Sequence, residues 1–388
     1  MLNELKAIAK DEGVLLFFIF LPVVYPLLYS WIYNNEVVRE VPIALIDNSH
    51  SAMSREFANK VDASPDVSID YHCSSIEEAR NLIGHGKAYG IIYIPNDFDK
   101  NIGRGEQAHV SVYCDMSYML TYKAIITTAT IVSMEMGTEI QRQKLGNKTD
   151  CEDEIATQPL AYDEVAIFNT TSGYGNFMLP GVLVLIIQQS ILLGVGMIGG
   201  TEREAAYRNY RRKNRQSTLT KAMTMLCDKT VAYALIFSVM LAWVTLAVPH
   251  IFGFVSLVHA ADLFMFLTPY LLACIFFAIT FSEIVRYRES VMLVVVFTSV
   301  PLLFMSGVSW PLSAISGVWQ GVSVLFPSTF CIRGFIRMSS MGALLPDVIK
   351  EYHALWMQTV CYASTAAFVI WRRVKRAENA KSEVKAEA

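Results

Sequence analysis

Charged residues are scarce in this chain of 388 residues, and motifs that would carry out chemistry are missing. Only 17% of the residues are charged and 53% are hydrophobic, whereas ordinary soluble domains are about 25% charged. The seven cysteines include no Cys-x-x-Cys pair, which argues against a zinc site or a dense disulfide framework. No Walker A, His-Glu-x-x-His or Gly-x-Ser-x-Gly sequence occurs. We therefore expect a membrane protein that is not an enzyme and that has no catalytic residue, metal site or cofactor of its own.

Six stretches are long and apolar enough to cross a bilayer as helices, which takes about 20 mostly apolar residues. A further apolar segment, Ile315–Ile332, contains Pro327, two glycines and Gln320. We interpret it as a re-entrant or interfacial pair of helices within an outer segment 311–352, because irregular backbone is tolerated at membrane depth where protein buries it. We expect Arg333–Tyr352 to lie at the outer interface. The six predicted spans are Val14–Tyr33, Asn176–Ile198, Thr230–Val248, Asp262–Phe281, Val291–Trp310 and Ala354–Trp371.

The distribution of Lys and Arg predicts the orientation of these spans. The segment Gly200–Asp228 carries seven Lys or Arg residues, whereas Pro249–Ala261 carries none. Short loops rich in Lys and Arg stay on the cytoplasmic side. We therefore expect both termini and the loop 199–229 to be cytoplasmic, with a basic tail at 372–388. Residues 1–13 are predicted to form an amphipathic helix at the inner interface.

About 140 residues separate the first two spans, which is too many for a loop. Apolar runs at Val41–Asp47, Val67–Tyr71, Tyr89–Ile94, Val110–Cys114 and Val165–Phe168 are typical of strands, and helical patterns at Ser51–Ala63, Ser75–Gly84 and Tyr118–Leu145 lie between them. Alternating strands and helices predict an α/β domain over residues 34–175, and the orientation of the spans makes it extracytoplasmic. Its three cysteines, Cys73, Cys114 and Cys151, allow at most one bridge and are otherwise free thiols. The predicted fold class is therefore an α-helical polytopic membrane protein with an inserted α/β extracytoplasmic domain.

Polar residues inside or beside the spans are candidates for function. Gln188 and Gln189 lie midway along the second span and could line a path or bond to a neighbouring helix, which is the commoner use. Gly194-Val-Gly-Met-Ile-Gly199 matches a dinucleotide fingerprint, but it lies inside a span, so we interpret it as a surface for close helix packing. The charged residues at the inner end of the fourth span are expected to form a solvated face; they are Glu283, Arg286, Arg288 and Glu289.

Several stretches in order resemble the permeases of ABC-type-2 exporters (type V fold). VPIALIDNSHSAMSREFANKVDASP resembles the start of their large external domain, and IFNTTSGYGNFMLPGVLVLIIQQ resembles their entry into the second span. GTEREAAYRNYR occupies the position of their coupling segment. MSGVSWPLSAISGVWQGVSVLFPSTF resembles their signature around the fifth span. The resemblance covers nearly the whole chain.

The resemblance implies a half-transporter in a bacterial inner membrane that exports drugs or other amphiphiles. Two permease chains, identical or closely related, would pair with two copies of a separate ABC ATPase subunit, which would bind ATP and Mg. A periplasmic adaptor is a further candidate partner; membrane lipid surrounds the spans, and no nucleic acid is expected. Thr201, Glu202, Arg203, Glu204 and Tyr207 would contact the ATPase. The candidate transport path comprises Gln188, Gln189, Tyr25, Tyr29 and Phe304.

One alternative belongs to a different class of protein. The chain could be a membrane-anchored receptor or scaffold whose external domain binds a partner without transport. An adjacent ATPase gene, or an ATPase that co-purifies with the chain, would distinguish the two functions.

Overall fold

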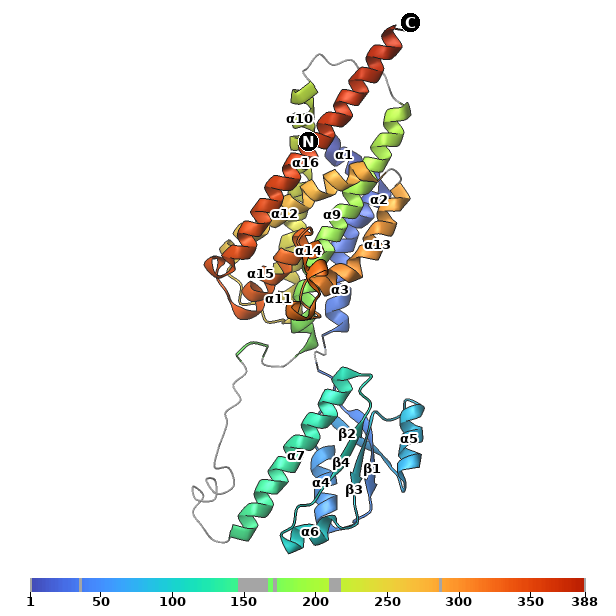
Figure 1. Ribbon diagram of the computed structural model, residues 1–388, viewed down its shortest axis with the longest axis vertical. Coiled ribbons are helices and arrows are strands. Elements are labelled where there is room, and N and C mark those ends of the chain that lie inside the picture. Colours follow the sequence, from blue (N-terminus) through green and yellow to red (C-terminus); the bar gives the residue numbers. More distant parts are fainter. Residues whose placement is uncertain are drawn as a thin grey trace. The chain divides into compact units, whose positions relative to one another are not determined.

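The computed structural model describes residues 2–34, 37–145, 167–169, 173–208, 218–285 and 288–386 (Figure 1). The chain divides into two compact units. One, here called the α/β domain, comprises Val37–Val165; the other, here called the helical unit, comprises Met1–Glu36 and Ala166–Ala388.

A four-stranded sheet organises the α/β domain. Its strand order is β2-β1-β3-β4, with β1 parallel to β2 and β3, and β4 antiparallel to β3. Ser51 opens α4 with a reciprocal pair of hydrogen bonds to Ser54, and the Ser75 hydroxyl accepts from the Glu78 amide at the start of α5. The strands are β1 (Val41–Asp47), β2 (Val67–His72), β3 (Gly90–Ile94) and β4 (Ser111–Cys114), and the helices are α4 (Ala52–Asp62), α5 (Ile76–Gly84), α6 (Phe98–Arg104) and α7 (Met119–Leu145).

Helices cover both faces of this sheet. Ile43 and Ile92 pack in the cluster that contains Phe57 of α4 and Val132 of α7. Alternate residues of the same strands face the other way, into a smaller cluster that includes Ala79 of α5. Burial on both faces explains why β1 and β3 are continuous apolar runs rather than alternating ones. The predicted α/β domain is thus confirmed, with α6 as an addition. Of the predicted last strand, Val165 lies outside the described residues, and Ile167 and Phe168 are not in a strand.

The two described cysteines of the α/β domain are free thiols. Cys73 follows β2 and Cys114 ends β4, so they lie at opposite edges of the sheet. Three strand spacings, about 14 Å, separate the edges, which is far beyond the reach of a disulfide. Burial raises the pKa of the Cys114 thiol to about 11. The pKa of the Cys73 thiol is also raised, mainly by burial and to a smaller extent by the negative charge of Glu78. A bridge between these two is therefore excluded; Cys151 lies outside the described residues.

Six helical segments of the helical unit are long and apolar enough to cross a membrane. The first begins at α2 (Glu12–Leu15) and passes through a π-helical turn, η1 (Leu16–Phe20), into α3 (Leu21–Ile32). Figure 1 shows α1 (Leu2–Lys10) at the same end of this unit as the end of α9. The other five are α9 (Tyr174–Arg208), α10 (Thr218–Ala242) with η2 (Trp243–Ala247) and α11 (Val248–Phe252), α12 (Ala260–Ile284), α13 (Arg288–Met305) and α16 (Ile349–Ala386). The predicted six spans are confirmed by length and composition.

Helix α9 is the centre of the bundle. In its most apolar stretch 94% of the residues are buried inside the chain, against 17% for α13. Its glycines explain how neighbours approach so closely: a Cβ at Gly194 would lie 1.9 Å from a ring carbon of Phe18, and one at Gly196 would lie 2.5 Å from Val291. The prediction that this glycine motif serves helix packing is confirmed.

The segment between α13 and α16 does not form a seventh span. It consists of η3 (Leu312–Ala314), α14 (Gly317–Ser323), α15 (Pro327–Met341) and η4 (Leu345–Val348), each shorter than a bilayer requires. A position of residues from Arg333 onward at the outer interface stays a prediction, but the rest of α15 packs against protein. Phe335 and Met338 are fully buried in the core, because Gly334 lets the Phe266 ring approach the helix backbone.

The glycine at the centre of α9 gives a direct test of this packing. Gly194→Ala should destabilise the protein by about 1–3 kcal/mol, because its Cβ would overlap the Phe18 ring. Gly321→Ala in α14 is the matched control, since a Cβ there meets nothing within 4 Å. Thermal unfolding midpoints in detergent measure both. Equal midpoints for Gly194→Ala and the wild type would contradict the close contact between the first and second spans.

Candidate functional site

The end of α9 continues as a helix well beyond the membrane stretch. The candidate span ends at Thr201, but α9 remains helical to Arg208. The predicted ATPase contacts Glu202, Arg203, Glu204 and Tyr207 therefore lie on a continuation of the second span, not on a separate short helix. Of this segment, only the Thr201 side chain is described, and residues 209–217 lie outside the described residues. We call Thr201–Arg208 the coupling segment, and the end of the bundle that carries it the basic end.

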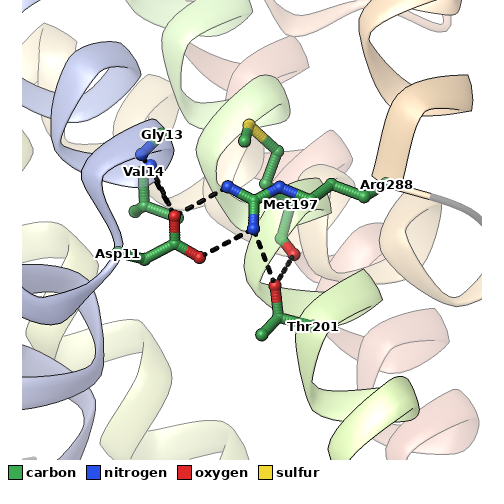
Figure 2. Close-up of polar contacts among 6 residues, drawn as sticks. All are labelled: Asp11, Gly13, Val14, Met197, Thr201 and Arg288. Carbon is green, nitrogen blue, oxygen red and sulfur yellow. Dashed lines mark hydrogen bonds and ion pairs between the residues drawn. The ribbon is translucent and has the colours of Figure 1, made fainter.

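One arginine joins three elements at the basic end (Figure 2). The Arg288 guanidinium, at the start of α13, donates to both Asp11 carboxylate oxygens, at 2.7 and 3.0 Å. It also donates to the Thr201 hydroxyl at 3.4 Å, and that hydroxyl donates to the Met197 carbonyl oxygen at 3.1 Å. A paired arginine–carboxylate contact is among the stronger and more directional polar interactions in proteins. We call Asp11, Thr201 and Arg288 the clasp.

The same carboxylate also begins the first span. Asp11 Oδ1 accepts hydrogen bonds from the Gly13 and Val14 amides, so Asp11 is the N-cap of α2. Partial burial raises the pKa of this carboxyl, but the Arg288 hydrogen bond and charge and the two amides outweigh it, so the pKa is lowered from its usual value. The carboxylate therefore stays ionised at neutral pH and holds the arginine.

Two glycines make room for Arg288, one beside its guanidinium and the other beside its backbone. A Cβ at Gly13 would lie 2.5 Å from an Arg288 guanidinium nitrogen, and one at Gly200 would lie 3.3 Å from the Arg288 Cα atom. The first, second and fifth spans are thus packed closely around one side chain. Because a larger residue at position 13 would meet the guanidinium, the sequence Asp-Glu-Gly is suited to both the cap and the ion pair.

Two further ion pairs join helices near the basic end. Lys229 of α10 lies 3.6 Å from Glu4 of α1 and is almost fully buried. Arg373 of α16 lies 3.0 Å from Glu283 of α12. The expectation of a solvated charged face is therefore wrong for Glu283 and Arg288, whose partners come from distant parts of the chain. Arg286 lies outside the described residues.

Helix α1 packs on the protein with its apolar side. Ile8 is buried in the core of the helical unit, and Leu5 packs against that core. The predicted amphipathic helix therefore forms, held by the Glu4 ion pair and by its apolar side. A position at the inner membrane interface stays a prediction.

The two glutamines of α9 are both buried, but they differ in their partners. Gln188 is 1% exposed, and its amide oxygen accepts from the backbone N–H of Ser328 at 2.8 Å. It thereby caps the N-terminus of α15, where N–H groups have no partner in the helix. Gln189 is 6% exposed, and its amide oxygen and nitrogen have no hydrogen-bond partner in the described part of the chain.

The aromatic path candidates are more exposed than these glutamines. Tyr25, Tyr29 and Tyr33 form a row along α3, with ring centroids 5.7 and 6.4 Å apart, and Tyr174 at the start of α9 continues it at 5.4 Å. Tyr25 and Phe304 are about half exposed. The candidates thus include two buried amides and two exposed rings. Their role in transport stays a prediction.

Analysis of the sequence did not identify the clasp or the ion pair of Lys229. A signal for Asp11 was present, since an aspartate directly before an apolar helical run is typical of an N-cap. Its partner Arg288 is 277 residues away, and no pattern in the sequence connects the two. Among the described residues, no group of three or more His, Cys, Asp or Glu could hold a metal ion.

Comparison with known proteins gives one family. The family model described as "ABC-2 family transporter protein" matches residues 13–368, which is most of the chain. The searches of curated proteins and of solved structures returned no match. The match includes Thr201 and Arg288 of the clasp, the coupling segment and the α/β domain between the first two spans. The chain therefore belongs to the ABC-2 family of transporter membrane proteins.

Proposed function

We propose that this chain is the membrane half of an ATP-driven exporter of drugs or other amphiphilic compounds. Family membership makes it a permease whose ATPase lies in a separate subunit, and it favours transport over the alternative of a receptor or scaffold. The proposal adds the direction of transport, the chemical class of the substrate and the way ATP is coupled to it. The exporter would consist of two permease chains and two ATPase subunits in a bacterial inner membrane, with a periplasmic adaptor as a further partner.

The observation that carries this proposal is the course of α9. It is the most enclosed of the six candidate spans, and it continues as one helix into the coupling segment. A force applied to the coupling segment therefore acts on the helix that contacts most of the bundle. The loop 200–228 is rich in Lys and Arg, which favours a cytoplasmic position for the basic end, where an ATPase would reach it.

The charges of the coupling segment are proposed to orient the ATPase. Charged groups at interfaces determine register and partner choice more than raw affinity. The double change Glu202→Lys/Glu204→Lys should lower transport per ATP hydrolysed by about tenfold, equivalent to about 1.4 kcal/mol of coupling. The permease would be purified with the ATPase that accompanies it, and uptake of ethidium, an amphiphilic cation, would be measured in inside-out vesicles.

The α/β domain offers a matched control for these charge reversals. Asp97→Lys/Asp99→Lys makes the same change at the same spacing on exposed residues of that domain. It should leave the ratio of transport to hydrolysis near that of the wild type. Equal ratios for all three proteins would remove Glu202 and Glu204 from the coupling contact, and the absence of any co-purifying ATPase would contradict the exporter.

The transport path is proposed to run between two permease chains, with Gln189 as a polar contact that is enclosed in this conformation and would be uncovered when the spans move apart. Paths for amphiphiles are mostly apolar with few polar groups, and the Gln189 amide has no hydrogen-bond partner in the described chain. Tyr25, Tyr29 and Phe304 would supply apolar and aromatic surface. Gln188 would act by holding α15 in position beside this path.

The two adjacent glutamines can be separated by the same substitution. Gln188→Leu should lower stability by about 1–3 kcal/mol, because it leaves the Ser328 N–H unpaired. Gln189→Leu should leave the unfolding midpoint unchanged or higher, yet alter the rate or range of ethidium and related dyes exported. Wild-type export of every dye by Gln189→Leu would show that this amide is not on the path.

A further inference from the structure

The clasp connects the coupling segment to two other spans. Thr201 is the first residue of that segment, Asp11 begins the first span, and Arg288 begins the fifth. Figure 2 shows the Arg288 guanidinium between the Asp11 carboxylate and the Thr201 hydroxyl, reached from three different helices. A single side chain therefore connects all three elements.

The clasp tolerates little relative movement. Its two parallel hydrogen bonds fix the plane of the guanidinium against the carboxylate. The Asp11 carboxylate is in turn fixed by the Gly13 and Val14 amides of the same helix. A Cβ at Gly13 would meet the guanidinium, and one at Gly200 would press against the Arg288 backbone. A displacement of α9 along its axis must therefore carry the Asp11–Arg288 pair with it or break the Thr201 hydrogen bond and the Gly200 contact that join α9 to that pair.

Apolar packing farther along α9 joins the same three spans as the clasp. Phe18 of the first span lies against Gly194, and Val291 of the fifth span lies against Gly196. From Gly194 to Thr201 the helix rises by about 10 Å, so the three spans are in contact over about two turns. Polar and apolar contacts thus join the same three helices.

We infer that Arg288 is a positioning residue for energy coupling: through Asp11 and Thr201 it makes the first and fifth spans move with the coupling segment. The inference rests on the proposed function, since it assumes an ATPase that displaces that segment. It goes further by naming which spans the displacement moves. The residue acts through its neighbours and does not itself contact substrate or nucleotide.

Variants of the clasp separate its charge from its role as a helix cap. Asp11→Asn keeps an oxygen for the Gly13 and Val14 amides, because asparagine is as good an N-cap as aspartate, but it removes the negative charge opposite Arg288. Arg288→Gln removes the positive charge. The ion pair between Lys229 and Glu4 holds α1 independently of these changes.

A matched control exists at the same end of the bundle. Arg373 and Glu283 form an ion pair of similar length and exposure, but it joins the fourth and sixth spans. Arg373→Gln therefore removes a comparable ion pair and leaves the clasp intact. A role of Arg288 that is merely structural would give the two arginine variants the same behaviour.

The experiment measures movement directly in the complex of permease and ATPase, in lipid nanodiscs of phosphatidylethanolamine and phosphatidylglycerol. Spin labels at position 28 of the first span and position 239 of the third, both exposed in this chain, report the distance between the two spans with ADP and with ATP plus vanadate. The wild type and Arg373→Gln should show a nucleotide-dependent shift. Arg288→Gln and Asp11→Asn should lose most of it while still hydrolysing ATP.

The outcomes separate this inference from the function on which it rests. A wild type without any nucleotide-dependent shift would contradict the proposed function. A shift in Arg288→Gln and Asp11→Asn equal to that of Arg373→Gln would overturn the clasp alone. The double variant Asp11→Asn/Arg288→Gln should be no worse than either single variant, because the two residues act as one pair; additive losses would also overturn the inference.

Discussion

The burial of α9 inside its own chain is the constraint on which the rest of the helical unit depends. A helix that touches protein on all sides gains nothing from the hydrophobic effect relative to lipid, so close packing and hydrogen bonds must hold it. Its glycines supply the close packing, by admitting Phe18 and Val291 to the helix backbone. Gln188 supplies the hydrogen bond, by capping α15. Both kinds of contact fix the register of α9 against its neighbours.

The same constraint explains why charges gather at the basic end. Helices that are tightly packed in the membrane must also be held in position relative to one another where they leave it. Three ion pairs do this, between α1 and α10, α2 and α13, and α12 and α16. Exposed ion pairs contribute little, but these are partly or almost fully buried, and one is a paired arginine contact. The end of the bundle where α9 continues into the coupling segment is therefore also the end where its helices are tied together.

Much of this organisation could be predicted from the sequence, because it depends on local composition. The six spans follow from apolar length, and the α/β domain follows from alternating strand and helix patterns closed by caps such as Ser51 and Ser75. The glycine motif predicted close helix packing, but it did not identify the residues that pack against it. The sequence could not show whether a span is surrounded by lipid or by protein, because both surroundings favour apolar residues. Span two and span five are both apolar, yet one is enclosed and the other largely exposed. The clasp stayed hidden for a related reason: a lone Asp and a lone Arg beside spans are typical of solvated ends, and only the fold brings them together.

The basic end of the bundle is proposed to face the cytoplasm, where an ATPase can act on the coupling segment. Single cysteines would be introduced at position 213 of the basic loop and at position 104 of the α/β domain, in a background with all seven native cysteines replaced. An impermeant maleimide applied to spheroplasts should label position 104 at once and position 213 only after the membrane is opened. Labelling of position 213 in intact spheroplasts, with position 104 protected, would contradict the orientation and with it the proposed site of coupling.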